Sequence, residues 1–229
     1  MQENELETIR AKGSEQSRGD SSYYIHQTIL GLAAPFCEAA TSICDVGCGN
    51  GKILKQLRSK FPRTELHGID IGSFFDPNEI NVNFHKVDLN EEFPQALENH
   101  FDVVISSEVI EHLENPRHFI RQLTKVVRPK GVIILSTPNT HSILSLLTYD
   151  LKGHHNAFGP KDYPAHITAV SPYDLKQMIK EIPNVHLVKM GYVHYGRIPG
   201  TGISWQQILP ILNGKSFSDN YFVVMTKNE

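Results

Sequence analysis

CDVGCGNGK, residues 44–52, places three glycines at alternating positions behind a short apolar run. The segment SICDVG (42–47) predicts a buried strand that stops at glycine, and GKILKQLRSKF (51–61) predicts an amphipathic helix directly after it. A strand, a glycine-rich turn and a helix in this order begin a βαβ unit. In such units the first strand-to-helix turn usually forms the floor of a ligand site.

The alternation of strand and helix continues along the chain, and this decides the fold class. ELHGIDIG (65–72), VNFHKVDL (82–89), FDVVISSEV (101–109) and GVIILSTPN (131–139) predict further strands, and NPRHFIRQLTKVV (115–127) predicts a helix. Strands that are unbroken apolar runs and alternate with helices are typical of a parallel sheet covered on both faces. We therefore expect an α/β fold with three layers.

The ends of the chain complete the prediction. Residues 1–20 are polar and are expected to be flexible, and an amphipathic helix interrupted by Gly31 and Pro35 is expected after them. After an irregular His-, Gly- and Pro-rich segment (141–170), a helix is expected over 171–182 with Ser171 as N-cap. Two strands are expected after this helix, over 185–195 and 220–227.

No linker composition divides the chain, so we expect a single domain over residues 21–229. The segments 141–170 and 196–219 lie outside the strand and helix repeat and are expected to cap the open side of the ligand site. The second of them contains Arg197 and Trp205, and its tryptophan could equally be a packing anchor.

Composition excludes several classes of function. The chain has 229 residues, of which 40% are hydrophobic, and a net charge of -3, so it lacks the basic excess expected of a nucleic-acid-binding enzyme. It has no apolar stretch of membrane-spanning length and no signal-peptide pattern at its start, and we expect a cytoplasmic location. The three cysteines form no CxxC pair and are expected to be reduced. The twelve histidines are a more conspicuous feature of the composition than the net charge. The composition is compatible with a homodimer.

The spacing of the glycine turn excludes two kinds of phosphate loop. A dinucleotide fingerprint (GxGxxG) counted from Gly47 requires glycine at the position of Lys52. A P-loop requires Ser or Thr after Gly-Lys, where this chain has Ile53, and a glycine where it has Val46. The turn therefore fits a ligand without a phosphate at this position.

Five motifs occur in a fixed order along the chain: DVGCGNGKI (45–53), Asp70, Asp88, FDVVISSEVIEHLENP (101–116) and VRPKGVIILSTPN (127–139). Together they resemble the class I S-adenosylmethionine-dependent methyltransferases. The resemblance covers residues from about 40 to 140 and is closest to the ubiquinone-biosynthesis O-methyltransferases, which also carry a Glu-x-x-Glu-His stretch. It implies a Rossmann-like three-layer sandwich with a seven-stranded, mostly parallel sheet and an antiparallel last strand.

The resemblance implies S-adenosyl-L-methionine as cofactor. Glycines would let the backbone approach its amino acid tail, Asp70 would bind both ribose hydroxyls, and Asp88 would accept from the adenine amino group. Tyr23, Tyr24 and His26 could close over the cofactor from the N-terminal helix. The expected cofactor-binding residues are Asp45, Gly47, Cys48, Gly49, Gly51, Asp70, Ile71, Asp88, Leu89, Ser106 and Ser107.

Methyl transfer to a hydroxyl requires removal of its proton, and a histidine near neutral pKa is a suitable base. His112 is the leading candidate because it follows the fourth strand, and His166 is the second catalytic candidate. His154 and His155 lie in the same expected cap segment as His166.

A metal interpretation of the same residues is equally open. Glu108, Glu111 and His112 are spaced i, i+3 and i+4, which on a helical turn puts them on one face. With His166 they could bind a divalent cation such as Mg or Zn, which would hold two acceptor oxygens and lower a hydroxyl pKa. Alternatively, Glu111 and His112 only shape the loop.

We therefore expect a methyltransferase, most simply an O-methyltransferase of a small molecule such as a phenolic compound, a quinone precursor or a sugar-like metabolite. A metal-dependent RNA ribose 2'-O-methyltransferase is a second hypothesis, against which the charge balance argues. A non-catalytic S-adenosylmethionine-binding protein is a third.

Overall fold

The computed structural model describes residues 22–229. The segment predicted to be flexible, residues 1–20, lies outside the described residues. The described chain forms a seven-stranded sheet in the order β3-β2-β1-β4-β5-β7-β6. All neighbouring strands are parallel except that β7 runs antiparallel to both β5 and β6. The predicted mostly parallel sheet with an antiparallel last strand is confirmed.

The observed strands lie close to the residue ranges predicted for them. They are β1 (Ser42–Val46), β2 (Glu65–Asp70), β3 (Asn83–Lys86), β4 (Phe101–Ser107), β5 (Val127–Pro138), β6 (Val185–Tyr192) and β7 (Asn220–Lys227). The helices are α2 (Tyr23–Cys37), α3 (Lys52–Lys60), α4 (Pro116–Val126), α5 (Ile143–Lys152), α6 (Pro172–Lys180) and α7 (Trp205–Ile208), with short 3-10 turns η1 (Asn78–Ile80), η2 (Gln95–Leu97) and η3 (Ile110–His112).

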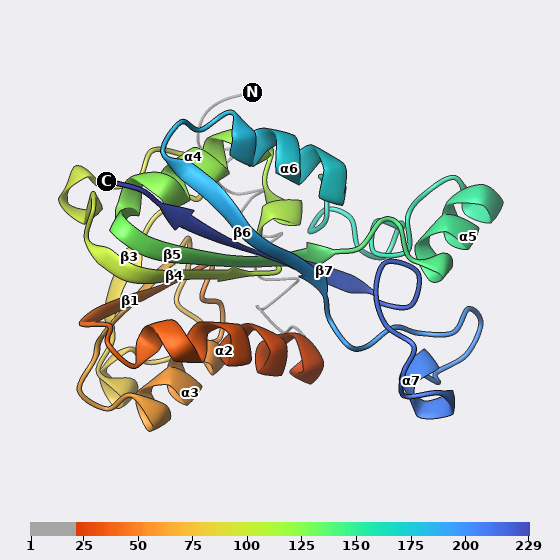
Figure 1. Cartoon of the computed structure of the whole chain (residues 1–229), viewed down its shortest axis with the longest axis horizontal. Coiled ribbons are helices and arrows are strands. Elements are labelled where there is room, and N and C mark those ends of the chain that lie inside the picture. Colours follow the sequence, from red (N-terminus) through yellow and green to blue (C-terminus); the bar gives the residue numbers. More distant parts are fainter. Residues whose placement is uncertain (1–21) are drawn as a thin grey trace.

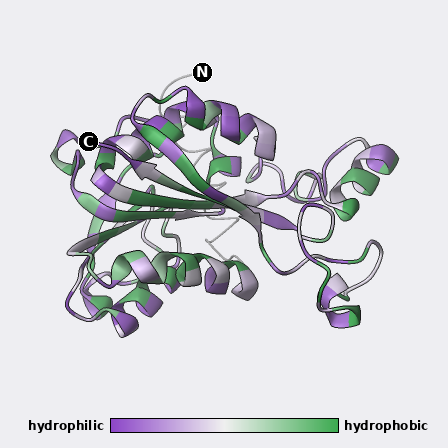
Figure 2. Cartoon of the chain, viewed as in Figure 1, coloured by the Kyte–Doolittle hydropathy of each residue, from purple (hydrophilic) through white to green (hydrophobic). Residues whose placement is uncertain are grey.

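Two helical layers cover the sheet. α2 and α3 lie on one face and α4 and α6 on the other, while α5 and α7 project beyond one end of the sheet (Figure 1). Hydrophobic residues follow the strands and the sheet-facing sides of the helices (Figure 2). No helix within residues 22–229 is long and apolar enough to cross a membrane.

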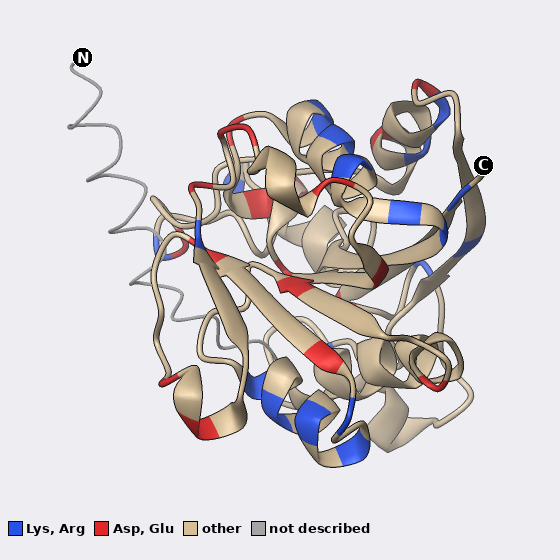
Figure 3. Ribbon diagram, turned by 90° about the vertical axis from the view of Figure 1, so that its left-hand side faces the viewer, with Lys and Arg blue, Asp and Glu red and all other residues tan. Residues whose placement is uncertain are grey.

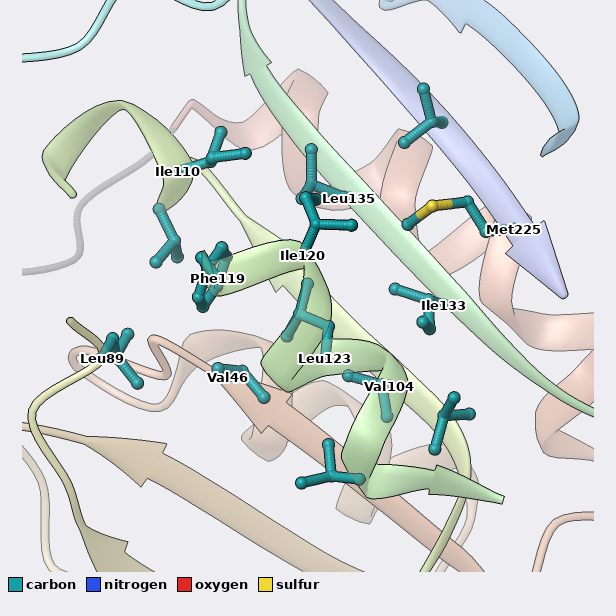
Figure 4. Packing of buried hydrophobic residues seen from close by; sticks show 14 of the residues in the cluster. Val46, Leu89, Val104, Ile110, Phe119, Ile120, Leu123, Ile133, Leu135 and Met225 are labelled. Atoms are coloured by element: carbon teal, nitrogen blue, oxygen red, sulfur yellow. The ribbon is translucent and has the colours of Figure 1, made fainter. Parts of the chain in front are cut away.

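Each face of the sheet has its own hydrophobic core. On the α4 and α6 face, Phe119, Ile120 and Leu123 of α4 pack over the central strands, where Val104 and Ile133 stand beneath them (Figure 4). On the other face the apolar sides of α2 and α3 pack against the same strands. Burial of both faces explains why the middle of a central strand is an unbroken apolar run, such as residues 103–105 in β4 and 132–135 in β5, instead of alternating.

The chain reverses its winding direction between β1 and β4. From β1 it proceeds outward to β2 and β3, and it then returns to place β4 on the other side of β1. The turns after β1 and β4 therefore face each other across a crevice at the carboxyl ends of the strands. Open α/β sheets bind their ligands in this crevice.

One predicted interruption is wrong: α2 continues through Gly31 and Pro35. Proline cannot donate to the carbonyl four residues earlier, and that residue here is Gly31. The helix loses one hydrogen bond near its carboxyl end. Ile29, Ala33 and Cys37 bury one side of α2 on the sheet, and this packing keeps the helix continuous.

The segment 141–170 is also less irregular than predicted, because it contains α5. The hydroxyl of Ser142 accepts from the backbone N–H of Ser145 and caps the start, and Gly153 ends the helix with a φ of 77°. Both residues are standard signals for helix ends. At the next helix, the expected N-cap Ser171 is confirmed, since its hydroxyl accepts from the N–H of Asp174.

Candidate functional site

A cavity of about 570 Å³ opens at the carboxyl ends of β1, β2 and β4. Residues 156–157 and 163–167, which follow α5, also line it. Most of the predicted cofactor residues line this cavity, and Gly51 and Ser106 do not. The predicted residues that line it are Asp45, Gly47, Cys48, Gly49, Asp70, Ile71, Asp88, Leu89 and Ser107.

The turn after β1 can be made only by glycine at its tightest points. Gly47 has a φ of 77°, and a Cβ added there would collide with the side chain of Val109. Gly51 has a φ of 71°, and its Cβ would lie 2.9 Å from the ring of Phe75. Gly51 therefore shapes the turn without reaching the cavity. The absence of side chains leaves a backbone cradle that a ligand can approach closely.

Two buried aspartates lie beside this cradle. Asp70, the last residue of β2, accepts from the backbone N–H of Gly49 at 2.8 Å and of Gly72 at 3.4 Å. Asp45 is buried, and its Oδ1 has no hydrogen-bond partner among the described residues. Burial, with a smaller contribution from the charge of Asp70, raises the pKa of Asp45 to about 8. A buried acceptor without a donor favours a ligand that carries N–H or O–H groups.

The remaining predicted cofactor residues surround the cavity at the ends of β3 and β4. Asp88 lies two residues beyond β3, which ends at Lys86 and is shorter than predicted. Its Oδ1 accepts from the N–H of Asn90 at 2.9 Å. Leu89 is buried, whereas Ile71 is partly exposed. An apolar pair beside an acidic side chain fits a flat, polar-edged group such as a nucleobase.

The two serines at the end of β4 point in opposite directions, as successive strand residues must. The Ser106 side chain is fully buried, and its hydroxyl has no partner within residues 22–229. Ser107 faces the cavity, and its hydroxyl lies 3.0 Å from that of Ser136.

Burial raises the pKa of the Cys48 thiol well above its usual range, so this thiol stays protonated.

The turn after β4 differs from the predicted helical face. Glu108 has a left-handed φ of 56°, and the 3-10 turn begins only at Ile110. The left-handed backbone directs the Glu108 carboxylate to two partners. The hydroxyl of Ser136 donates to it at 2.9 Å, and the side-chain amide of Asn220 donates to its other oxygen. The expected i, i+3, i+4 alignment of Glu108 with Glu111 and His112 is therefore wrong.

Three of the four predicted metal ligands nevertheless converge. Glu111, His112 and His166 each place a potential ligand atom within 4.8 Å of the other two, and all three line the cavity. Glu108 is outside this group. His112 and His166 are 54 residues apart in the sequence, and the loop that follows α5 brings them together.

The two imidazoles are oriented by backbone carbonyls. His112 Nδ1 lies 2.8 Å from the carbonyl oxygen of Ala165, and His166 Nδ1 lies 2.6 Å from that of Ala157. An Nδ1–H bonded to a carbonyl leaves the lone pair of a neutral ring on Nε2. Burial and the neighbouring His166 lower the pKa of His112 to about 4. This pKa is below the near-neutral value expected for a base, and it keeps the ring neutral and able to bind a cation.

Glu111 completes this donor group. Its side chain is fully buried, and Thr137 donates to its Oε2 at 2.9 Å. Its Oε1 has no partner among the described residues. Burial, followed by the charge of Glu108, raises the pKa of Glu111 well above its usual range. A buried carboxylate oxygen without a donor, next to two neutral imidazoles, fits a cation or a donating hydroxyl group.

At the N-terminal helix, His26 lines the cavity, as do Ser22 and Ile25, which the sequence interpretation did not include. Tyr23 and Tyr24 do not line it. The ring of Tyr24 instead stacks on that of Tyr195, with centroids 4.4 Å apart. The helical periodicity from Ile25 could have indicated which side chains face inward.

The two cap segments, 141–170 and 196–219, also contain some residues that line the cavity and some that do not. Arg197 lines the cavity and forms an ion pair with Asp219 at 2.6 Å. Trp205 contacts Phe217 edge to face and is a packing anchor. His154 and His155 do not line the cavity; His155 Nδ1 bonds to the hydroxyl of Ser145. Further lining residues absent from the sequence interpretation are Asn50, Asn90, Asn156, Tyr163, Asp219 and Asn220.

Comparison with known proteins agrees with this geometry. Residues 18–182 match a family model described as a methyltransferase domain. A ubiquinone biosynthesis O-methyltransferase from Rickettsia bellii (strain OSU 85-389) is 30% identical over 194 residues, which cover 81% of this chain and 75% of the relative.

Solved structures share the fold. A SAM dependent methyltransferase from Archaeoglobus fulgidus superposes with a TM-score of 0.60 at 20% identity, over 90% of this chain and 95% of that one. The plantazolicin methyltransferase BpumL, in complex with a triazolic desmethylPZN analog and SAH, gives a TM-score of 0.62 at 18% identity, over 99% of this chain and 98% of that one. With the family match, these findings assign the chain to the class I S-adenosylmethionine-dependent methyltransferases with a Rossmann-like fold, of the ubiquinone biosynthesis O-methyltransferase type.

Proposed function

We propose that this methyltransferase acts on a hydroxyl group of a small molecule such as a phenolic compound, a quinone precursor or a sugar-like metabolite. The observation that carries the proposal is the group formed by Glu111, His112 and His166, which shares one cavity with the glycine turn. The glycine turn and Asp70 would hold the methyl donor at one end. The imidazoles and Glu111 would receive the acceptor at the other.

The residues at the donor end fit S-adenosylmethionine, which supplies a methyl group already activated by a sulfonium. Asp70 would accept from the ribose hydroxyls while keeping its bond to Gly49 N–H. Asp88 would accept from the adenine amino group, and Ile71 and Leu89 would contact the two faces of the ring. Asp45 has a buried oxygen without a partner among the described residues. The ammonium of the amino acid tail would favour the ionised form of this carboxyl and pair with it.

At the acceptor end, we propose that a divalent cation such as Mg or Zn is held by Glu111, His112 and His166. Nitrogen and carboxylate ligands suit Zn²⁺ better than Mg²⁺. The orphaned Oε1 of Glu111 and the two carbonyl-oriented imidazoles support this set. Such a cation would lower the pKa of a bound hydroxyl. Glu108 would act behind this group, by orienting Asn220 and Ser136.

The acceptor class follows from the relatives and the cavity. The curated relative named above is a ubiquinone biosynthesis O-methyltransferase, and we extend its reaction type to this chain. Tyr163 and Arg197 at the cavity lining would contact a partly apolar, oxygen-rich ring. The segments 141–170 and 196–219 would cap it. A cytoplasmic location and a homodimer remain predictions.

The test is methyl transfer to a panel of acceptors, followed by mass spectrometry. We expect a mass gain of one methyl group on a compound with two adjacent hydroxyls, loss of turnover with a chelator, and recovery with Mg²⁺ or Zn²⁺. A singly hydroxylated analogue of the same ring is the control. Full turnover in the chelator would refute the cation, and the absence of transfer to any hydroxyl in the panel would refute the reaction.

The same assay separates the proposal from its main rival. A short RNA with a free 3' ribose enters the panel as a further acceptor. The chain carries 22 basic against 25 acidic residues. In Figure 3 the basic residues lie mainly on the helices above and below the sheet, whereas acidic residues mark the strands between them. Because RNA binding requires a basic face, we expect no methylation of the RNA.

A further inference from the structure

A second group of histidines lies at the opposite end of the sheet from the cavity. We call it the edge histidine cluster: Glu65, His67, Asn83, His85 and His100. Glu65 and His67 belong to the amino-terminal half of β2, Asn83 and His85 belong to β3, and His100 directly precedes β4. The parallel register sets His67 beside Asn83. None of the five residues lines the cavity described above.

The donor atoms of this cluster are close together. Nε2 of His67 lies 3.1 Å from Oε1 of Glu65. The side-chain amide nitrogen of Asn83 lies 2.9 Å from the same oxygen and 3.5 Å from His67 Nε2. Glu65, His67 and His100 each place a ligand atom within 4.8 Å of the other two. Ligands at the bond lengths of tetrahedral zinc are about 3.3 Å apart, so small side-chain movements would close the site.

His67, the buried member of the cluster, contacts a second histidine through its other ring nitrogen. Nδ1 of His67 lies 2.9 Å from Nε2 of His85, and the two ring planes are parallel to within 2°. Without an ion, the 3.1 Å contact fits an Nε2–H of His67 that donates to Glu65. When Nδ1 donates to His85 instead, the lone pair of His67 is on Nε2, where an ion can bind it together with Glu65. Metal-binding histidines are typically oriented in this way by a partner on the other ring nitrogen. Burial lowers the pKa values of His67 and His85, which keeps both rings neutral.

The geometry points to a zinc site formed by His67, His100 and Glu65, with the amide of Asn83 as a fourth ligand after a 180° turn that presents its oxygen. Imidazole and carboxylate donors without a thiolate match Zn²⁺. Glu65, Asn83 and His100 are exposed, so the ion can enter from solvent. A bound ion would tie the edge strand β3 and its neighbour β2 to the start of β4, and would stabilise the fold.

The experiment is a Zn²⁺ titration against a chromophoric chelator, with protein that carries no polyhistidine tag. Replacement of both His112 and His166 by Asn removes the imidazoles of the cavity, and this double variant is the background. We expect the background protein to bind one Zn²⁺ per chain and to gain several degrees of Tm. Adding Glu65→Gln and His100→Asn, both at exposed positions, should weaken Zn²⁺ binding at least about 100-fold and remove the gain.

His186→Asn in the same background is the matched control, because His186 is a surface histidine bonded to Asn228 and outside both groups. It should leave Zn²⁺ affinity unchanged. The inference is overturned if the background protein binds no Zn²⁺, or if Glu65→Gln with His100→Asn does not weaken binding. Methyl transfer by the wild-type chain carrying only these two replacements should stay intact, which separates this site from the proposed function.

Discussion

Gly47 shows how one residue shapes the ligand cradle. Its φ of 77° and the contact that a Cβ would make with Val109 are both unfavourable for any other residue. We predict that Gly47→Ala lowers the free energy of unfolding by about 1–3 kcal/mol and weakens S-adenosylhomocysteine binding. Urea denaturation and calorimetry measure the two effects.

Gly31→Ala is the matched control for that substitution. Gly31 is inside α2, has no heavy atom within 4 Å of an added Cβ, and has no positive φ. Alanine should raise the free energy of unfolding there by about 0.5–1 kcal/mol. Equal stability of the Gly47→Ala protein and the wild type would show that the cradle does not require glycine.

Asp45 gives a prediction for pH. Its pKa in the folded chain is raised from 3.8 to about 8, so the folded state holds a proton that the unfolded state releases. Its contribution to stability is therefore fully present below about pH 4 and lost as the pH rises through about 8. Asp45→Asn removes this dependence, and the variant should be more stable than the wild type by an amount on the order of 1–3 kcal/mol at pH 8 to 9. Urea titrations of both ligand-free proteins at pH 5 and pH 9 make the comparison. A difference in stability that stays the same at the two pH values would contradict the buried, protonated carboxyl.

At the scale of elements, Asp102 joins the start of β1 to β4 and β5. Its Oδ2 accepts from the N–H and hydroxyl of Thr41 and from the N–H of Ser42, at 2.8 to 3.0 Å, and Arg128 forms an ion pair with it. Burial works against its ionised form, but the hydrogen bonds from Ser42 and Thr41 and the charge of Arg128 keep its pKa lowered.

We predict that Asp102→Ala lowers the free energy of unfolding by about 2–4 kcal/mol, because it leaves the buried N–H of Ser42 without an acceptor. Arg128→Ala should cost only about 0–1 kcal/mol, since that side chain is half exposed. Urea denaturation at neutral pH compares the two variants. Equal losses would mean that the ion pair, rather than the hydrogen bonds, joins the strands.

The elements also show how far sequence patterns reach. The apolar strands and the cap Ser171 are local signals that predict what the structure has. The prediction missed α5, although Gly153 is a local signal for its end. The direction of Glu108 could not be predicted, because spacing alone does not reveal a left-handed φ. The continuity of α2 through Pro35 depends on burial against the sheet, which is a tertiary effect.

At the scale of the molecule, the sequence order of the strands places the glycine turn, Asp70 and Asp88 at one edge of a parallel sheet, and this much could be predicted. The sequence allows His112 to meet His166 but does not require it, because the loop after α5 has no periodic pattern that would fix its path. The edge histidine cluster has no motif at all, since the sheet topology alone brings His67 and His100 together.

The central claim is that the two ends of one cavity have separate roles, with Asp70 at the donor end and His112 at the acceptor end. The most direct measurement is the dissociation constant for S-adenosylhomocysteine by calorimetry in Asp70→Ala and His112→Ala. We predict a loss of affinity of about 100-fold or more for Asp70→Ala, because hydrogen bonds to a carboxylate are lost, and a change of no more than about threefold for His112→Ala. Unchanged affinity in folded Asp70→Ala, or equal losses in the two variants, would contradict the claim.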